Sequence, residues 1–385
     1  MNFILGILFS IVVVSILALI PLIGVGTAPL VPEWVSEWVS IPRYEYFVRY
    51  VFGVIIPYAA IIIFILGFVF KILKWSFSPN PYRIPTTAGQ QKSLPWIKQN
   101  KLDNPSSTMG VLGRMFFEIF LFRSLFRNTS LEFRKGAKIT YEWEKWLWIA
   151  ALAFHYSFLV VVLRHLRFFT EPIPGFVHLL ETVDGFLEVG IAPLSGFMTP
   201  GLLISGLMLG AAATYLFLRR VYLPQTRYIS LPADYFPLFL ILGIAGTGIM
   251  MRYMGAFMQF AFNTDWLTVP VVQVKALGIG LVTGNPEVPE EIGTLFFIHL
   301  FLVCVLLAYF PFSKLMHMGG VFLSPTRVLA NNSRAKRHVN PWDYPVKTHT
   351  YDEYEEEFRE KMIEAGLPVE KMPEAEAETE EAEKE

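Results

Sequence analysis

Long apolar runs separated by more polar connections dominate the chain. A helix that crosses a bilayer needs about 20 predominantly apolar residues, and six stretches of the sequence meet that requirement. The six runs cover residues 3–26, 48–73, 145–169, 197–218, 234–258 and 293–317. The pattern therefore predicts an all-α integral membrane protein with six transmembrane helices, the first of which is a retained span rather than a signal peptide.

The distribution of Lys and Arg orients these runs. Basic residues gather in 75–144 and after the fourth and sixth runs, whereas 27–47, 170–196 and 259–292 carry few of them. Loops on the cytoplasmic side of a membrane are enriched in Lys and Arg. We therefore expect a multi-pass protein of the cytoplasmic membrane, with the insert 75–144 and the C-terminus in the cytoplasm.

Two segments outside the runs have their own patterns. Residues 116–130 (FFEIFLFRSLFRNTS) are apolar but interrupted by Glu118, Arg123 and Arg127. This pattern is typical of an amphipathic helix, either at the membrane surface or docked against a partner. The tail 326–385 is rich in Glu from Tyr351 onward and cannot bury a core, so we expect a cytoplasmic segment that is helical in part and otherwise disordered.

Composition narrows the chemistry. Of 385 residues, 54% are hydrophobic and 17% charged, and the formal net charge of -1 argues against a nucleic-acid partner. The mean hydropathy of +0.45 agrees with a lipid environment. The single cysteine, Cys304, cannot by itself hold an iron–sulfur cluster, a zinc ion or an internal disulfide. Any redox cofactor must therefore be held by other residues.

Four of the seven histidines lie in the apolar runs. His155 and His165 belong to the third run, and His299 and His317 to the sixth. An ionisable side chain in lipid is costly, so it normally faces the helical bundle and has a partner there. Because these two runs cross the membrane in opposite directions, we expect His165 beside His299 near the outer surface, and His155 beside His317 near the cytoplasm.

Two histidine pairs at two depths are typical of two bis-histidine haems, in which each iron takes two axial imidazoles. Eighteen residues make five helical turns, which places His299 and His317 on one face. The rise of about 27 Å between them exceeds the rise of about 15 Å between His155 and His165, so a kink at Pro311 is expected. Satisfied core histidines, or a haem-free transporter or channel subunit with a histidine proton relay, stay open as alternatives.

At these residues the chain resembles a known family. The segments VIIPYAAIIIFILGF (54–68), FHYSFLVVVLRH (154–165) and HLFLVCVLLAYFPFSKLMH (299–317) resemble the gamma subunit of respiratory nitrate reductase and its relatives. These are membrane cytochromes b with five spans and two haem b groups. The resemblance implies a di-haem cytochrome b domain over 48–325, with the outer haem held by His165 and His299 and the inner haem by His155 and His317.

Three additions to the family pattern are the N-terminal span within 1–47, the insert 75–144 and the Glu-rich tail. These resemble the cytochrome b subunit of heterodisulfide-reductase-like menaquinol-oxidising complexes linked to dissimilatory sulfite reduction. The resemblance implies a quinol-oxidising subunit that passes electrons from menaquinol to a cytoplasmic iron–sulfur subunit of the heterodisulfide reductase type. It also implies a role in sulfate or sulfite respiration and further membrane and cytochrome c subunits. The alternative within the family is a nitrate reductase gamma subunit itself.

Several polar residues near the outer ends of the runs are candidates for supporting roles. Quinol oxidation needs a proton acceptor, and His178, Glu181 and Asp184 are available in the outer connection. Arg164 and Arg252 are candidate partners for haem propionates, because a guanidinium pairs well with carboxylates. The glycines of LGIAGTG would admit either a close helix or a haem face; they are Gly243, Gly246 and Gly248.

Overall fold

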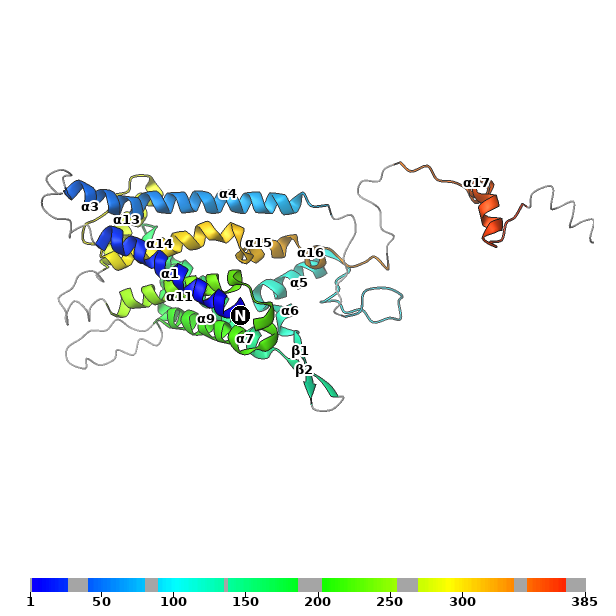
Figure 1. Cartoon of the computed structure of the whole chain (residues 1–385), viewed down its shortest axis with the longest axis horizontal. Coiled ribbons are helices and arrows are strands. Elements are labelled where there is room, and N and C mark those ends of the chain that lie inside the picture. Colours follow the sequence, from blue (N-terminus) through cyan, green and yellow to red (C-terminus); the bar gives the residue numbers. More distant parts are fainter. Residues whose placement is uncertain are drawn as a thin grey trace, which may run out of the picture. The chain divides into compact units, whose positions relative to one another are not determined.

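The computed structural model describes residues 2–26, 41–79, 89–134, 138–185, 203–254, 269–335 and 345–371. The chain divides into two compact units, Met1–Ala335 and Lys336–Glu385. In its described part the first unit consists of helices and one antiparallel pair of strands, β1 and β2 (Figure 1). The predicted domain boundaries at residues 47 and 325 stay predictions.

The helices and strands of the first unit follow the predicted runs and the connections between them. The longer helices are α1 Asn2–Gly26, α3 Ile41–Tyr50, α4 Ile56–Ser76, α5 Thr108–Leu121, α7 Lys145–His165, α8 Gly175–Asp184, α9 Ile204–Tyr222, α11 Pro232–Tyr253, α13 Val271–Thr283 and α14 Thr294–Tyr309. The shorter elements are η2 Val51–Ile55, α6 Arg123–Phe126, β1 Thr129–Arg134, β2 Lys138–Trp143, η3 Leu166–Phe168, α10 Pro224–Ile229, η4 Phe310–Phe312, η5 Lys314–Met316, α15 His317–Gly320, η6 Val321–Leu323 and α16 Pro325–Val328.

The predicted all-helical membrane class is confirmed, and the count of six spans is met approximately. Among the described residues, five helical segments are long and apolar enough to cross a membrane: Phe3–Val25, Tyr46–Ser76, Lys145–Phe168, Pro232–Tyr253 and Thr294–Phe312. The fourth predicted run, 197–218, corresponds in part to α9, and its first six residues lie outside the described ranges. The last turn of α9 contains Arg219 and Arg220, which make this helix less apolar than the other five.

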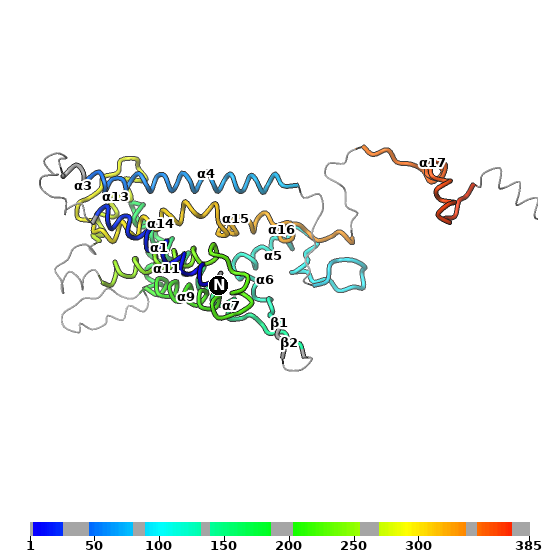
Figure 2. Tube along the Cα trace, viewed as in Figure 1, coloured from blue at the N-terminus to red at the C-terminus, as the bar shows by residue number. Residues whose placement is uncertain are grey.

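The long helices form one bundle. α7 packs along α9, α9 along α11, and α11 along α14, while α4 covers another side of α14 (Figures 1 and 2). The N-terminal helix α1 crosses α11 and α14 and belongs to the same bundle. Their shared core consists of Leu209, Leu240, Ile241, Leu295, Ile298, Leu302 and Leu306. Exposed aliphatic side chains on α1 and α4 fit contact with lipid tails.

The sixth predicted run is not one continuous helix. α14 ends at Tyr309, and a 3₁₀ turn over Phe310–Phe312 leads to Ser313, which has an extended backbone with φ -118° and ψ 176°. Pro311 has no N–H to donate, so the break falls where the kink was expected. The prediction that His299 and His317 share one helix face was wrong, because His317 begins the separate helix α15.

The connection 259–292, predicted as an outer loop, contains the apolar helix α13. With 13 residues it is too short to cross a bilayer. It packs directly on η3, the turn that follows His165. A Cβ at Gly278 would lie 2.2 Å from the carbonyl oxygen of Phe168, so this close approach requires glycine.

The insert is more structured than its amphipathic pattern indicated. The helix predicted within 116–130 begins earlier, as α5 at Thr108, and ends at Leu121. The next residue, Phe122, is a non-glycine residue with a positive φ of 48°. The short helix α6 and the strand β1 follow it, and β1 pairs with β2 in antiparallel register. The exposed face of α5 is apolar and consists of Met109, Leu112, Phe116 and Phe120.

The second unit contains α17 Tyr351–Glu364 in its described part. Thr350 and Glu353 form a capping box at its start, which satisfies backbone N–H groups of the first turn. Backbone N–H groups of Glu370 and Lys371 donate to the Glu355 carboxylate and, with Arg359, hold its pKa below the usual value. A helical part of the tail was predicted; residues 372–385 lie outside the described ranges.

Candidate cofactor site

The four histidines of the apolar runs lie in two pairs. The ring centres of His165 on α7 and His299 on α14 are 6.4 Å apart, and the rings are nearly parallel at 17°. The ring centres of His155 on α7 and His317 on α15 are 6.0 Å apart, with the rings at 81°. The structure therefore brings together the residues that the antiparallel topology pairs, at two levels of the bundle.

One ring nitrogen of each histidine is already hydrogen-bonded within the protein. The Nδ1 atoms of three of them lie 2.7 to 2.8 Å from backbone carbonyl oxygens. The pairs are His155 with Ala151, His165 with Val161, and His317 with Lys314. A carbonyl oxygen only accepts, so Nδ1 carries the proton and Nε2 keeps its lone pair in the neutral ring. This is the tautomer that a metal ligand needs.

The fourth histidine, His299, has a side-chain partner in addition to a backbone hydrogen bond with Ile244. Its Nδ1 lies 2.9 Å from the hydroxyl oxygen of Thr247 on α11. That hydroxyl lies 2.8 Å from the carbonyl oxygen of Gly243 and donates its proton there. The hydroxyl oxygen is then the acceptor for the His299 Nδ1–H, so the Nε2 of His299 also keeps its lone pair. No sequence signal distinguishes Thr247 from other threonines in apolar helices.

The spacing within each pair fits one metal ion between two imidazoles. With metal–nitrogen bonds of about 2 Å, two opposed imidazoles place their ring centres about 6 Å apart. The observed separations of 6.4 and 6.0 Å meet this value. On α11, a Cβ at Gly248 would lie 3.4 Å from Cε1 of His299, whereas Gly243 packs against Val14 and Leu302. Gly248 thus keeps the space beside the outer pair clear, and Gly243 serves helix packing.

A buried ion pair lies beside the outer histidine pair. Arg164, next to His165, places Nη1 2.5 Å from a carboxylate oxygen of Asp184, and both side chains are largely buried. The backbone N–H and the hydroxyl of Ser205 also donate to Asp184, each over 2.6 Å. Asp184 therefore joins α7, α8 and the start of α9. The Arg164 Nε is buried and has no hydrogen-bond partner among the described residues.

The other outer candidates lie on α8 and α11. Glu181 pairs with Arg167 over 2.6 Å, and His178 lies 3.8 Å from Glu181 with a mostly exposed side chain. This separation is longer than a hydrogen bond, but both side chains are more exposed than that of Asp184. Arg252 lies close enough to Arg164 for their charges to interact, and its guanidinium stacks on Tyr253 at 5.7 Å.

The structure adds one cation that sequence reasoning missed. Lys275 on α13 pairs with Glu171, just beyond the end of α7. Lys275 is three residues before Gly278, so it lies on the same face of α13 that contacts η3. Lys275 is the only Lys or Arg in the sequence segment 259–292. This isolated positive charge is the sequence signal that could have marked it as a candidate.

The fold and site define a multi-pass helical membrane protein in which four histidines lie in two close pairs. The model of the nitrate reductase gamma subunit family matches residues 111–336. The chain belongs to this family.

Two relatives are similar over most of their length. The Hdr-like menaquinol oxidoreductase cytochrome b-like subunit of Archaeoglobus fulgidus is 43% identical over 300 residues, which cover 76% of this chain and 83% of the relative. The protein of the same name from Archaeoglobus profundus is 41% identical over 294 residues, covering 75% and 81%. The family predicted from the histidine segments is thereby confirmed.

Asp184→Asn is expected to destabilise the protein, because it leaves the buried guanidinium of Arg164 without a countercharge. Breaking a buried ion pair in this way costs about 3–5 kcal/mol. Thermal unfolding of the purified protein in detergent should show a clearly lower Tm. Glu171→Gln is the matched control, since the Glu171 side chain is 62% exposed and its pair with Lys275 contributes little. Equal Tm values for the two variants would contradict this role of Asp184.

Proposed function

We propose that the chain is a di-haem cytochrome b subunit that oxidises menaquinol and delivers electrons to a partner across the membrane. The observation that carries this proposal is the arrangement of the four histidines. In each pair the ring centres lie 6.0 to 6.4 Å apart, and the Nδ1 of each histidine is hydrogen-bonded to a carbonyl or hydroxyl oxygen, which leaves its Nε2 free to bind a metal. His165 and His299 would hold the outer haem, and His155 and His317 the inner one.

The donor set fits haem better than a bare metal ion. Two imidazoles leave a zinc or copper ion with an incomplete set of ligands. Across the described ranges, no group of three or more His, Cys, Asp or Glu side chains is placed to hold a metal. A haem supplies its own equatorial nitrogens and needs only the two axial ligands that each pair offers. When bound, haem would provide one-electron redox chemistry in a position closed to other axial ligands.

Menaquinol is proposed as the electron donor because the two relatives carry that activity in their names. We place its oxidation at the outer end of the bundle, beside His165. Each quinol hydroxyl must lose a proton, and Glu181 with His178 offers an accessible acceptor pair. Asp184 is proposed to act there by holding Arg164 and the start of α9. Arg164 and Arg252 remain the proposed propionate partners of the outer haem.

The acceptor is proposed to be a cytoplasmic iron–sulfur subunit of the heterodisulfide reductase type. The chain has only one cysteine, buried in α14, so such a cluster must belong to a partner. The basic insert and the C-terminal tail are proposed to lie on the cytoplasmic side with it. We also propose that the complex contains further membrane and cytochrome c subunits and that it acts in sulfate or sulfite respiration.

A nitrate reductase gamma subunit is the second candidate, because the matching family model carries that description. The two candidates share the haem site and differ in the partner. Isolation of the native complex from the membrane separates them: an iron–sulfur subunit related to heterodisulfide reductase supports the first, and a molybdenum enzyme the second. A haem-free transporter or channel subunit would carry neither partner.

Reduction of the purified protein by a soluble naphthoquinol tests the quinol site. After rapid mixing with the quinol, the optical spectrum should change from that of the oxidised haems to that of the reduced haems. Glu181→Gln should slow this reduction by about 10²-fold, the contribution typical of a general base, without loss of haem. Glu290→Gln, which removes an exposed carboxylate elsewhere in the outer connections, should leave the rate unchanged. Equal rates in both variants would remove Glu181 from the mechanism.

Thr247→Val should raise the midpoint potential of the outer haem. A hydrogen bond from Nδ1–H makes the imidazole a stronger donor, which favours the oxidised iron. Without the hydroxyl, His299 loses this bond. Thr214→Val is the matched control, because the Thr214 hydroxyl bonds only the carbonyl oxygen of Gly210, 2.8 Å away in the same helix. Optical redox titration measures both; identical potentials in the two variants would contradict the role of Thr247.

A further inference from the structure

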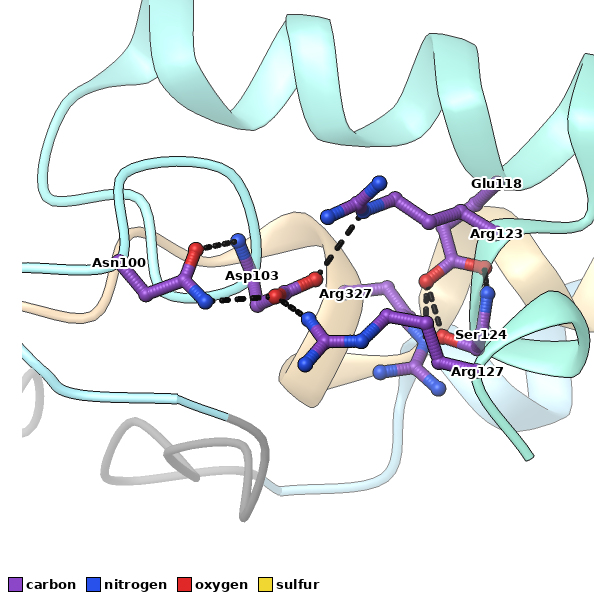
Figure 3. A network of polar contacts seen from close by, with 7 residues as sticks. All are labelled: Asn100, Asp103, Glu118, Arg123, Ser124, Arg127 and Arg327. Atoms are coloured by element: carbon purple, nitrogen blue, oxygen red, sulfur yellow. Dashed lines mark hydrogen bonds and ion pairs between the residues drawn. The ribbon is translucent and has the colours of Figure 1, made fainter. Parts of the chain in front are cut away.

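A cluster of guanidinium and carboxylate groups joins the insert to the segment after α14. It contains Asp103 and Glu118 with the arginines of α6 and α16 and the arginine that follows α6 (Figure 3). An arginine of α5 lies close enough to Glu118 and Arg327 for their charges to interact. The arginines are Arg114, Arg123, Arg127 and Arg327. The cluster therefore has four positive and two negative side chains, an excess of positive charge within a partly buried region.

Both carboxylates of the cluster are fully engaged. Asp103 pairs with Arg123 over 3.1 Å and with Arg127, and it also accepts from Asn100 over 2.8 Å. Figure 3 shows these partners converging on the one carboxylate. Glu118 pairs with Arg327 over 3.6 Å and accepts from both the backbone N–H and the hydroxyl of Ser124. Neither carboxylate is hydrogen-bonded to Arg114.

Arg114 is the group that the cluster leaves unsatisfied. Its residue is 2% exposed, and its Nε and Nη1 atoms are buried without a hydrogen-bond partner among the described residues. Burial, followed by repulsion from Arg327 and partly opposed by Glu118, lowers the pKa of Arg114 to about 10. A buried guanidinium with unmet N–H groups is costly, so an anionic partner would stabilise this site strongly.

The position of Arg114 limits what that partner can be. On α5 it lies on the buried face with Val111 and Met115, opposite the apolar exposed face that ends at Phe120. The buried face of α5 meets α16, where Arg327 is close enough for its charge to interact with that of Arg114. Because the exposed face of α5 is apolar, an anion that binds Arg114 is expected on the α16 side.

The inner histidine pair, His155 and His317, lies close to the end of α5. Phe122, which directly follows α5, has its ring centre 5.0 Å from that of His155. His317 begins α15, and the chain continues through η6 into α16, which packs on α5 (Figure 1). Arg114 is seven residues from the end of α5, about 10 Å along the helix. His155 is thus linked to α5 through Phe122, and His317 through η6 and α16, so both histidines lie near the helix that carries Arg114.

We propose that Arg114 binds an ionised propionate of the haem held by His155 and His317. This inference rests on the proposed function, which supplies a carboxylate-bearing group at this end of the bundle. A guanidinium forms two parallel hydrogen bonds with a carboxylate, which would satisfy the free N–H groups of Arg114. Arg327 stays paired with Glu118 and reinforces the positive potential.

Redox titration of the purified protein tests this assignment. Arg114→Gln removes the countercharge of the propionate, so the more positive oxidised haem becomes favoured and the midpoint potential of one haem should fall. The His317→Ala variant identifies which haem that is. Arg114→Lys keeps the charge and should give a potential nearer to wild type. Arg334→Gln is the control, since Arg334 is an exposed arginine that follows α16.

The outcomes separate this inference from the proposed function. A fall confined to the haem that His317→Ala removes, larger for Gln than for Lys, supports the propionate contact. Unchanged potentials in Arg114→Gln with both haems present would overturn the contact and leave the cytochrome function standing. An equal fall in the Lys and Gln variants would also overturn it, because the charge would then be irrelevant. Absence of haem from the wild-type protein would count against the proposed function itself.

Discussion

The structure depends on one constraint: a polar group inside the hydrocarbon layer must find its partner within the protein. Each intramembrane histidine meets this constraint at Nδ1 with a carbonyl or a hydroxyl oxygen. The same bond leaves Nε2 without a proton, so this atom also needs a donor or a metal. The two Nε2 atoms of a pair are both acceptors, so neither can satisfy the other. A metal ion that takes both lone pairs would satisfy them together, which is the basis of the proposed haem sites.

The same constraint distinguishes Arg164 from Arg114 by the partners that each guanidinium has. Arg164 is buried beside Asp184, and that carboxylate is itself bonded to the backbone and side chain of Ser205. This arrangement stabilises the outer end of α7 without any cofactor. Arg114 is as deeply buried but has no such carboxylate to itself, because Glu118 already serves Arg327 and Ser124. Arg164 thus stabilises the fold, whereas Arg114 is the residue for which we propose a ligand.

The sequence predicted the pairing of the histidines because two independent patterns determine it. Charge bias orients the runs, and antiparallel runs place His165 at the level of His299. The break at Phe310–Ser313 could not be placed by periodicity, since FPFS continues the apolar pattern and only Pro311 signals a break. The antiparallel strands β1 and β2 were also missed, because their residues share the composition of ordinary connections. The helix α13 is apolar but was missed because its 13 residues fall short of the length of a membrane span.

The contacts of the supporting residues could not be predicted from the sequence, for a physical reason. The sequence does not distinguish three titratable residues of one connection, His178, Glu181 and Asp184. Only tertiary contacts show that the Asp184 carboxylate is already bonded to Arg164 and Ser205. Thr247 and Lys275 act through contacts 52 and 104 residues away along the chain. Such partners follow from packing, which no local pattern contains.

The most direct measurement is the haem content per chain, with a reduced-minus-oxidised optical spectrum, of the purified wild type and four single variants. These variants are His155→Ala, His165→Ala, His299→Ala and His317→Ala, with the exposed His178→Ala as control. The account predicts two haem b groups in the wild type and the control, and a loss of one in each of the four variants, with the same spectral component lost within each pair. A well-folded protein without haem, or the same haem content in all variants, would contradict it.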